Sequence, residues 1–176
     1  MKKIMAIMAA TFVVAAAQAA SFSWGADWVY SNTDQYNGTE AISGSAWLVV
    51  LGGSAGDISV NTSGAITLGA GNTQMDTGSI SDWMVNGIVD LAAATYNGQN
   101  FVMVGYDSVN QMFGVSDVYT MTGLSDVPAP NAIIHAFSND SEGYMHLNLA
   151  AVPEPTSMAL LALGVAAVGL RRKFRK

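Results

Sequence analysis

Short apolar runs separated by polar, glycine-containing segments make up the central part of the chain. Residues 46–51 (Ala-Trp-Leu-Val-Val-Leu) form a continuously apolar run, which predicts a strand that is covered on both faces and ends at the Gly-Gly pair 52–53. Residues 57–60 and 65–68 instead alternate apolar and polar side chains around the sequence Asn-Thr-Ser-Gly at 61–64. This alternation predicts a β-hairpin with a short loop.

The later part of this central region is also typical of strands. Residues 101–106 and 112–124 are rich in apolar and β-branched side chains, and a polar turn at 107–111 joins them. Residues 133–137 and 144–149 predict a second hairpin, closed across the polar loop between them.

Residues 81–95 are the one segment where the spacing favours a helix. Ser81 could cap its first turn, although Gly87 is unfavourable inside a helix. The apolar stripe consists of Val85, Ile88, Val89 and Ala92. Short strands, glycine-rich turns and one short helix together predict a mainly β fold, in which residues 20–152 form a single antiparallel domain of the β-sandwich or barrel type.

The distribution of charge adds a constraint on function. Residues 20–152 hold 12 of the 13 acidic side chains and no Lys or Arg, so the formal charge of this region is −12 with His neutral. Binding to nucleic acid is excluded for it, because phosphate recognition depends on basic side chains. Lysine Schiff bases and arginine phosphate clamps are excluded for the same reason. The chain also has no Cys, so its stability has to come from a packed core.

All seven basic residues lie near the two ends of the sequence, where they accompany apolar runs. Lys2 and Lys3 precede an apolar run at 4–17, and Ala17 and Ala19 supply the small residues that signal peptidase accepts. Residues 1–19 are therefore predicted to be a signal peptide that is removed during export.

The other end combines a Pro-Glu-Pro sequence, an apolar run at 158–170 and a basic tail. A helix over the apolar run would be about 20 Å long, shorter than the roughly 30 Å hydrocarbon core, so it would span the membrane only with local thinning. The positive-inside rule places the basic tail on the cytoplasmic side and the acidic domain outside. This tail consists of Arg171, Arg172, Lys173, Arg175 and Lys176.

Pro153, Glu154 and Pro155, followed by the apolar run and the basic tail, resemble the PEP-CTERM sorting signal of Gram-negative bacteria. The resemblance covers about 25 residues and implies that residues 153–176 are a sorting signal. It further implies an exosortase as processing partner, transient residence in the inner membrane, and delivery to the cell surface or extracellular matrix. The catalytic residues for that processing would belong to the exosortase. An ordinary single-pass anchor is the alternative.

Within the domain, no catalytic residues are predicted. His135 and His146 are its two imidazoles, there is no Cys nucleophile, and no Gly-x-Ser-x-Gly sequence is present. Zinc binding would require both histidines and an Asp to converge. Paired carboxylates could hydrolyse a glycoside, but no spacing marks two of them as a pair.

Calcium is the cation that this acidic composition suits best, because hard cations bind carboxylate and carbonyl oxygens. The densest set of such oxygens lies in the loop 139–143, with Asp107 and Asp117 beside neighbouring strands. The loop matches no EF-hand pattern. We therefore expect a solvated acidic turn, no bound metal and no cofactor.

Aromatic side chains are concentrated near the start of the domain, at Trp24, Trp28, Tyr30, Tyr36 and Trp47. They could stack on sugar rings or anchor the core. We expect a non-enzymatic, exported protein with a structural or interaction role in the extracellular polysaccharide layer. A glycan-binding module that uses Trp24 and Trp28 is one alternative, and a small glycan-active hydrolase is another.

Overall fold

A computed structural model of the chain describes residues 20–31, 43–125 and 133–153. The predicted signal peptide with Ala17 and Ala19, Glu154 and Pro155, the apolar run and the basic tail lie outside the described residues. In the described part, no helix is both long and apolar enough to cross a membrane.

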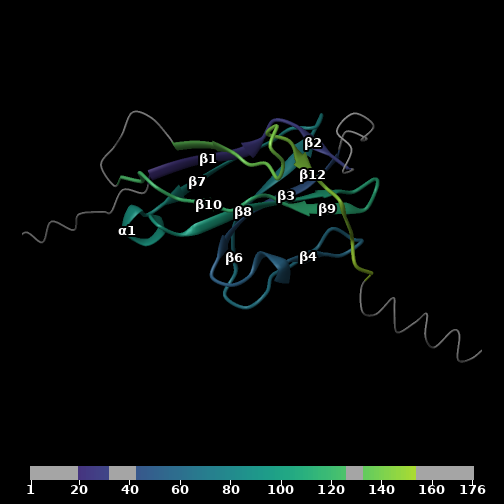
Figure 1. The fold of residues 1–176 in the computed structure, drawn as a ribbon, viewed down its shortest axis with the longest axis horizontal. Helices are drawn as coiled ribbons and strands as arrows, with labels where there is room; N and C mark the ends of the chain where they lie inside the picture. The colour runs from purple at the N-terminus through teal and green to yellow at the C-terminus, as the bar shows by residue number, and fades with distance from the viewer. Residues whose placement is uncertain (1–19, 32–42, 126–132, 154–176) are drawn as a thin grey trace, which may run out of the picture.

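The described residues form short strands with very little helix, which confirms the mainly β prediction (Figure 1). The strands are β1 (Ala20–Ala26), β2 (Val29–Tyr30), β3 (Ser43–Leu51), β4 (Ser59–Val60), β5 (Ile66–Thr67), β6 (Thr73–Ser81), β7 (Val85–Leu91), β8 (Asn100–Asp107), β9 (Met112–Val115), β10 (Tyr119–Thr120), β11 (Ile133–Ala136), β12 (Met145–His146) and β13 (Leu149–Ala150). The helical elements are the 3-10 turn η1 (Ala55–Asp57) and the helix α1 (Ala93–Tyr96).

Two sheets account for most of the fold. The larger sheet has the order β13-β9-β8-β3-β6, with β10 pairing β8, and all of its pairings are antiparallel. The smaller sheet has the order β11-β1-β7, and β2 pairs separately with β12. In Figure 1, β1 and β7 lie on one side of β8 and β9, and β4 lies on the other.

Apolar side chains cover both faces of β3, as its continuous apolar sequence predicts. Ala46 and Leu48 belong to the main core, which the smaller sheet closes with Phe22 and other buried residues. Trp47 and Val49 belong to a second core on the opposite face, which the segment around β4 and β5 covers. Strand β3 therefore lies in the middle of a three-layered packing. A strand with alternating apolar and polar side chains would instead leave one face uncovered.

The predicted hairpin around residues 61–64 is confirmed by the antiparallel pair β4 and β5. Asn61 Oδ1 accepts hydrogen bonds from the backbone N–H groups of Ser63 and Ala65 at 3.1 and 2.7 Å. Gly64 has a φ of 82°, a left-handed conformation that glycine adopts without steric cost. The loop sequence thus supplies both the side-chain acceptor and the backbone freedom that the turn requires.

The predicted helix over residues 81–95 is wrong, except at its last three residues, which belong to α1 (Ala93–Tyr96). Residues 85–91 in the middle of this segment form β7, which pairs with β1 along its length. Trp24 of β1 lies opposite Gly87, and a Cβ on this glycine would lie 2.3 Å from the indole. The glycine that weakens the helical pattern is therefore the place where a core tryptophan packs against the strand.

The predicted hairpin between residues 133–137 and 144–149 is also wrong. Strand β11 pairs in parallel with β1, and β12 pairs in parallel with β2, so the two segments run along the first strands of the domain. Residues 137–144 connect β11 to β12. Local sequence shows the two apolar runs, but their partners lie more than 100 residues earlier in the chain.

Candidate functional site

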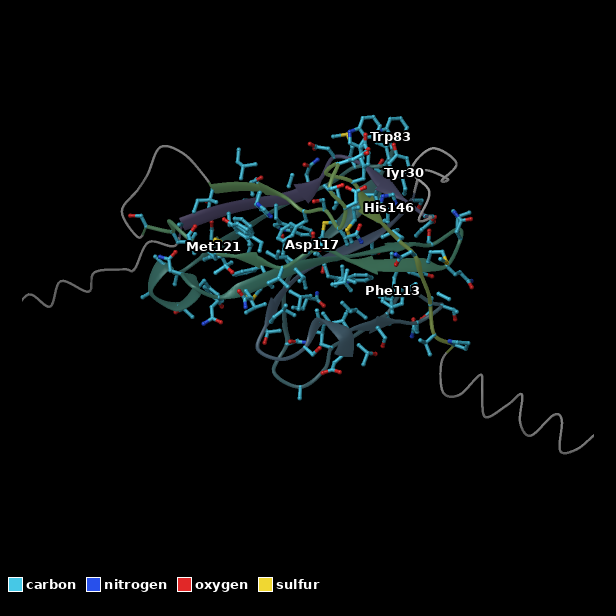
Figure 2. All side chains as sticks on the ribbon, in the orientation of Figure 1. Tyr30, Trp83, Phe113, Asp117, Met121 and His146 are labelled. Carbon is cyan, nitrogen blue, oxygen red and sulfur yellow. The ribbon has the colours of Figure 1, made fainter. Side chains whose placement is uncertain are left out.

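Four aromatic side chains form a continuous row at one end of the domain, and we call Trp83, Trp28, Tyr30 and Tyr144 the aromatic row. The rings of Trp83 and Trp28 are 5.9 Å apart between centroids and inclined by 4°. Trp28 and Tyr30 are 6.5 Å apart and inclined by 6°. Tyr144 meets Tyr30 edge-on at 5.6 Å. Figure 2 shows Trp83, Tyr30 and His146 gathered at this end, away from Met121.

Three separate segments supply the row, and backbone hydrogen bonds hold them together. Trp28 and Tyr30 lie two residues apart around β2, so they share one face while Val29 between them is buried. The Val29 N–H donates to the Trp83 carbonyl at 3.0 Å, which fixes the β6–β7 turn against β2. On the other side, the N–H of Met145 donates to the Trp28 carbonyl at 2.8 Å.

Exposure separates the row from the other tryptophans. Trp28 is 40% exposed, and the other three members of the row are half-buried. Trp24 is only 1% exposed, and its Nε1 donates to Asp76 Oδ2 at 2.9 Å in a contact between the two sheets. Of the two tryptophans suggested for glycan stacking, the structure thus places Trp28 at the surface and Trp24 in the core.

Trp83 is a candidate that sequence reasoning missed. It lies in a two-residue turn between β6 and β7, closed by reciprocal backbone hydrogen bonds between Ser81 and Met84 at 2.9 and 3.1 Å. The interpretation of residues 81–95 as a helix hid this turn. An Asp-Trp pair between two strand-like runs could have indicated it, but hairpin turns of this kind usually contain Asn-Gly.

The backbone of this turn is left-handed at both central residues. Asp82 has a φ of 50° and Trp83 a φ of 57°. Two consecutive positive φ values are characteristic of a type I′ turn, which suits the twist of a hairpin but is unfavourable for a bulky side chain. Strain of this kind costs about 1–3 kcal/mol per residue and persists where the surrounding structure imposes it.

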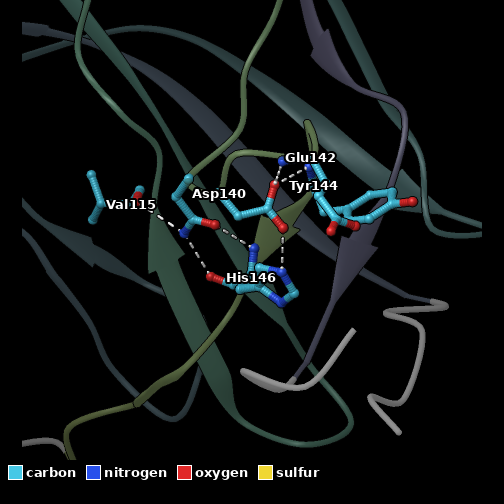
Figure 3. A network of polar contacts seen from close by, with 6 residues as sticks. Val115, Asp140, Glu142, Tyr144 and His146 are labelled. Atoms are coloured by element: carbon cyan, nitrogen blue, oxygen red, sulfur yellow. Dashed lines mark hydrogen bonds and ion pairs between the residues drawn. The ribbon is translucent and has the colours of Figure 1, made fainter. Parts of the chain in front are cut away.

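The acidic loop 139–143 closes on its own backbone and on His146, next to the aromatic row (Figure 3). Asp140 Oδ2 lies 2.8 Å from His146 Nε2, and its Oδ1 accepts from the N–H groups of Glu142 and Tyr144 at 3.0 and 2.7 Å. Burial alone would raise the pKa of Asp140, but these hydrogen bonds together lower it. The carboxylate therefore holds Tyr144 and His146 in position as a charged group.

Asn139 completes this network from the loop's other end. Its side-chain oxygen accepts from the His146 N–H at 2.7 Å, and its Nδ2 donates to the carbonyls of His146 and Val115 at 2.9 and 3.2 Å. His146 also stacks on Tyr30 with 6.0 Å between centroids. The loop thus ties β9, β12 and the aromatic row into one unit.

The residues suggested for metal binding do not come together. His135 lies in β11, stacks on Tyr119 at 3.7 Å and has a pKa lowered by burial, whereas His146 lies in β12. Asp107 is buried and accepts hydrogen bonds from Ser31, Val109 and Asn110, while Asp117 is exposed. In the three described ranges, no three His, Cys, Asp or Glu side chains converge in a metal-binding group.

The folded domain continues into the predicted sorting signal. Strand β13 pairs with β9, and the N–H of Ala151 donates to the Gln111 carbonyl at 3.0 Å. The N–H of Val152 donates to the Val60 carbonyl at 2.9 Å, and its own carbonyl accepts from the Thr62 N–H at 3.2 Å. Pro153 is the last described residue, so the Pro-Glu-Pro sequence begins directly after Val152, whose backbone is hydrogen-bonded to the β4–β5 hairpin.

Comparison with known proteins identifies the C-terminal segment. Residues 151–173 match the family model of the PEP-CTERM protein-sorting motif, which confirms the resemblance in this part of the chain. No curated protein and no solved structure matches the chain. The motif marks an exported protein that an exosortase sorts at the membrane, and it assigns no role to the domain that precedes it.

Proposed function

We propose that this PEP-CTERM protein is a non-enzymatic component of the cell surface or extracellular matrix, with an interaction role in the polysaccharide layer. The match over residues 151–173 supports the export and sorting in this proposal, and it overlaps the end of the folded domain at Ala151 and Val152. The domain is therefore the part of the chain that the signal would deliver.

A non-enzymatic role is consistent with how the reactive side chains are used. His146 contacts Asp140, and His135 packs between Tyr119 and Phe137. Asp107, the most buried carboxylate of the described residues, accepts hydrogen bonds that hold a turn. These contacts stabilise loops and strands in the described part of the chain, and the Ser31 hydroxyl that donates to Asp107 belongs to one of them.

A glycan-binding module is the second candidate, and the aromatic row favours it over a hydrolase. Flat, partly exposed aromatic rings in a continuous row supply a binding surface without any catalytic group. Release of reducing ends from a polysaccharide, abolished by replacing one carboxylate, would instead support the hydrolase.

Sorting can be tested by deleting the exosortase in the producing bacterium and following the size and location of the protein on immunoblots. We expect a larger, membrane-retained precursor in place of the released protein. A variant with Ala at 153–155 should behave in the same way, and Thr156→Ala serves as the adjacent control. An unchanged size and location in the deletion strain would contradict exosortase sorting.

A further inference from the structure

We propose that the aromatic row is a docking strip for a polysaccharide built from neutral or amino-bearing hexoses, and that Trp83 is kept in a strained turn to complete it. The inference deepens the glycan-binding candidate above and relies on the proposed export to bring the domain to its ligand. Its ligand class follows from ring geometry, backbone strain and charge.

The geometry of the rings suits a flat, extended ligand. Trp83, Trp28 and Tyr30 have nearly parallel planes, inclined by 4° and 6° between neighbours, so their faces share one orientation. Successive centroids lie 5.9 and 6.5 Å apart, farther than the separation of about 4 Å in a face-to-face contact, so the stacked rings are offset and Trp28 keeps 40% of its surface exposed. The apolar face of a hexose ring stacks on such a surface, and a polymer can occupy several rings at once.

The backbone at Trp83 is a second and independent observation. A type I′ turn with Asn-Gly would join β6 and β7 without strain, yet this chain places Asp82 and Trp83 there with φ values of 50° and 57°. Left-handed conformations of bulky residues are associated with ligand-binding positions, where the side chain is needed at that point. The Trp83 indole stacks on Trp28 and lengthens the row. A glycine at position 83 could not make this contact.

Charge restricts the class of polysaccharide. Asp27 and Asp82 are exposed and directly precede Trp28 and Trp83, and the exposed Glu142 lies two residues before Tyr144. No Lys or Arg occurs between residues 20 and 152. Carboxylates accept hydrogen bonds from sugar hydroxyls and attract ammonium groups, but they repel uronic acids. An acidic polymer such as alginate is therefore an unfavourable ligand.

The experiment uses the full chain, solubilised in a detergent without a sugar headgroup, and measures its retardation in native gels that contain a soluble polysaccharide. The probes are a neutral β-glucan, chitosan and alginate. We expect retardation by the glucan or by chitosan and none by alginate. Trp28→Ala and Trp83→Gly should each weaken binding by about tenfold or more, as expected for the loss of a central aromatic contact.

Thermal unfolding of the same variants separates binding from folding. Trp83→Gly should unfold at the same temperature as the wild type or higher, because glycine relieves the left-handed strain. Gln111→Gly is the matched control: it relieves a φ of 53° in the turn between β8 and β9, outside the aromatic row, and should retain binding. A stable Trp83→Gly protein that binds like the wild type would overturn the proposal.

Three other results would also overturn it: no retardation by either non-acidic polymer, equal retardation by alginate, or a dimer that Trp28→Ala dissociates. The last result would mean that a second copy of the chain covers the row. All of these results are independent of the exosortase deletion, so a failure of this inference can be told apart from a failure of the sorting proposal.

Discussion

Asp107 illustrates how single residues keep a charge inside this fold. The carboxylate is 1% exposed, and burial alone would raise its pKa. The Ser31 hydroxyl, the Asn110 side chain and the N–H groups of Val109 and Asn110 donate to it, and together they lower the pKa. The carboxylate thus connects the end of β2 to the turn that follows β8.

This lowered pKa predicts an acid-dependent contribution to stability. The folded pKa lies below the ordinary value of 3.8, so the stabilisation is complete above that value and is lost as the pH falls through the folded pKa. Asp107→Asn should reduce the free energy of unfolding by about 1–3 kcal/mol at pH 7 and by much less at pH 2. Circular dichroism melts across this range measure the difference.

The control for this variant is Asp117→Asn, which removes an equal charge from an exposed position and should change stability little at either pH. The free energies of unfolding of Asp107→Asn and wild type could instead differ by the same amount at pH 7 and pH 2. That result would contradict stabilisation by hydrogen bonds to the Asp107 carboxylate.

At the scale of elements, the pairing of β1 with β7 depends on Gly87. The Trp24 indole lies over this glycine, and a Cβ there would approach its ring atoms to 2.3–2.6 Å. Gly87→Ala should therefore destabilise the domain by about 1–3 kcal/mol, because the buried indole has no room to move. Urea unfolding monitored by tryptophan fluorescence measures the loss.

Gly56→Ala is the matched control in the same experiment. The nearest contact of a Cβ at Gly56 would be the Ser54 Oγ at 3.4 Å, and its φ is not left-handed. We expect this variant to be neutral or slightly stabilising, because alanine restricts the unfolded chain. Equal stability of the two variants would argue against the close packing of Trp24 on β7.

Local sequence predicts the elements whose causes are local. The hairpin of β4 and β5 follows from Asn61 and Gly64, and the burial of β3 follows from its unbroken apolar run. The helix over 81–95 fails because the spacing of its apolar residues was ambiguous, and contact with Trp24 decided in favour of a strand.

The candidate site was predictable only in part, because it is assembled from distant segments. Trp28 is visible in the sequence as an aromatic residue near the start of the domain, whereas Trp83 joins it through a turn 55 positions later and Tyr144 through a parallel pairing of β12 with β2. Sequence periodicity carries no information on such pairings. The burial of Trp24, which lies only four positions before Trp28, depends in the same way on the second sheet.

For the molecule as a whole, the distribution of charge predicts its behaviour toward proteases. Residues 20–152 contain no Lys or Arg, so trypsin has no site in them even when the domain is unfolded. The released protein should keep its size after denaturation and tryptic digestion on a gel. Chymotrypsin, which cuts after aromatic residues, is the positive control, and internal tryptic fragments would contradict the proposed limits of the mature protein.

The pairing of Val152 with the β4–β5 hairpin leaves only a short segment between the fold and the apolar run at 158–170. Five residues separate Val152 from Met158, where the apolar run begins, and a chain of that length reaches about 20 Å at most. If the run spans the bilayer as the sequence predicts, the unprocessed domain is held within roughly its own diameter of the lipid headgroups. Cleavage at the Pro-Glu-Pro sequence would then change a domain that binds within the membrane-proximal layer into a freely diffusing one. All of its described strands would stay in place.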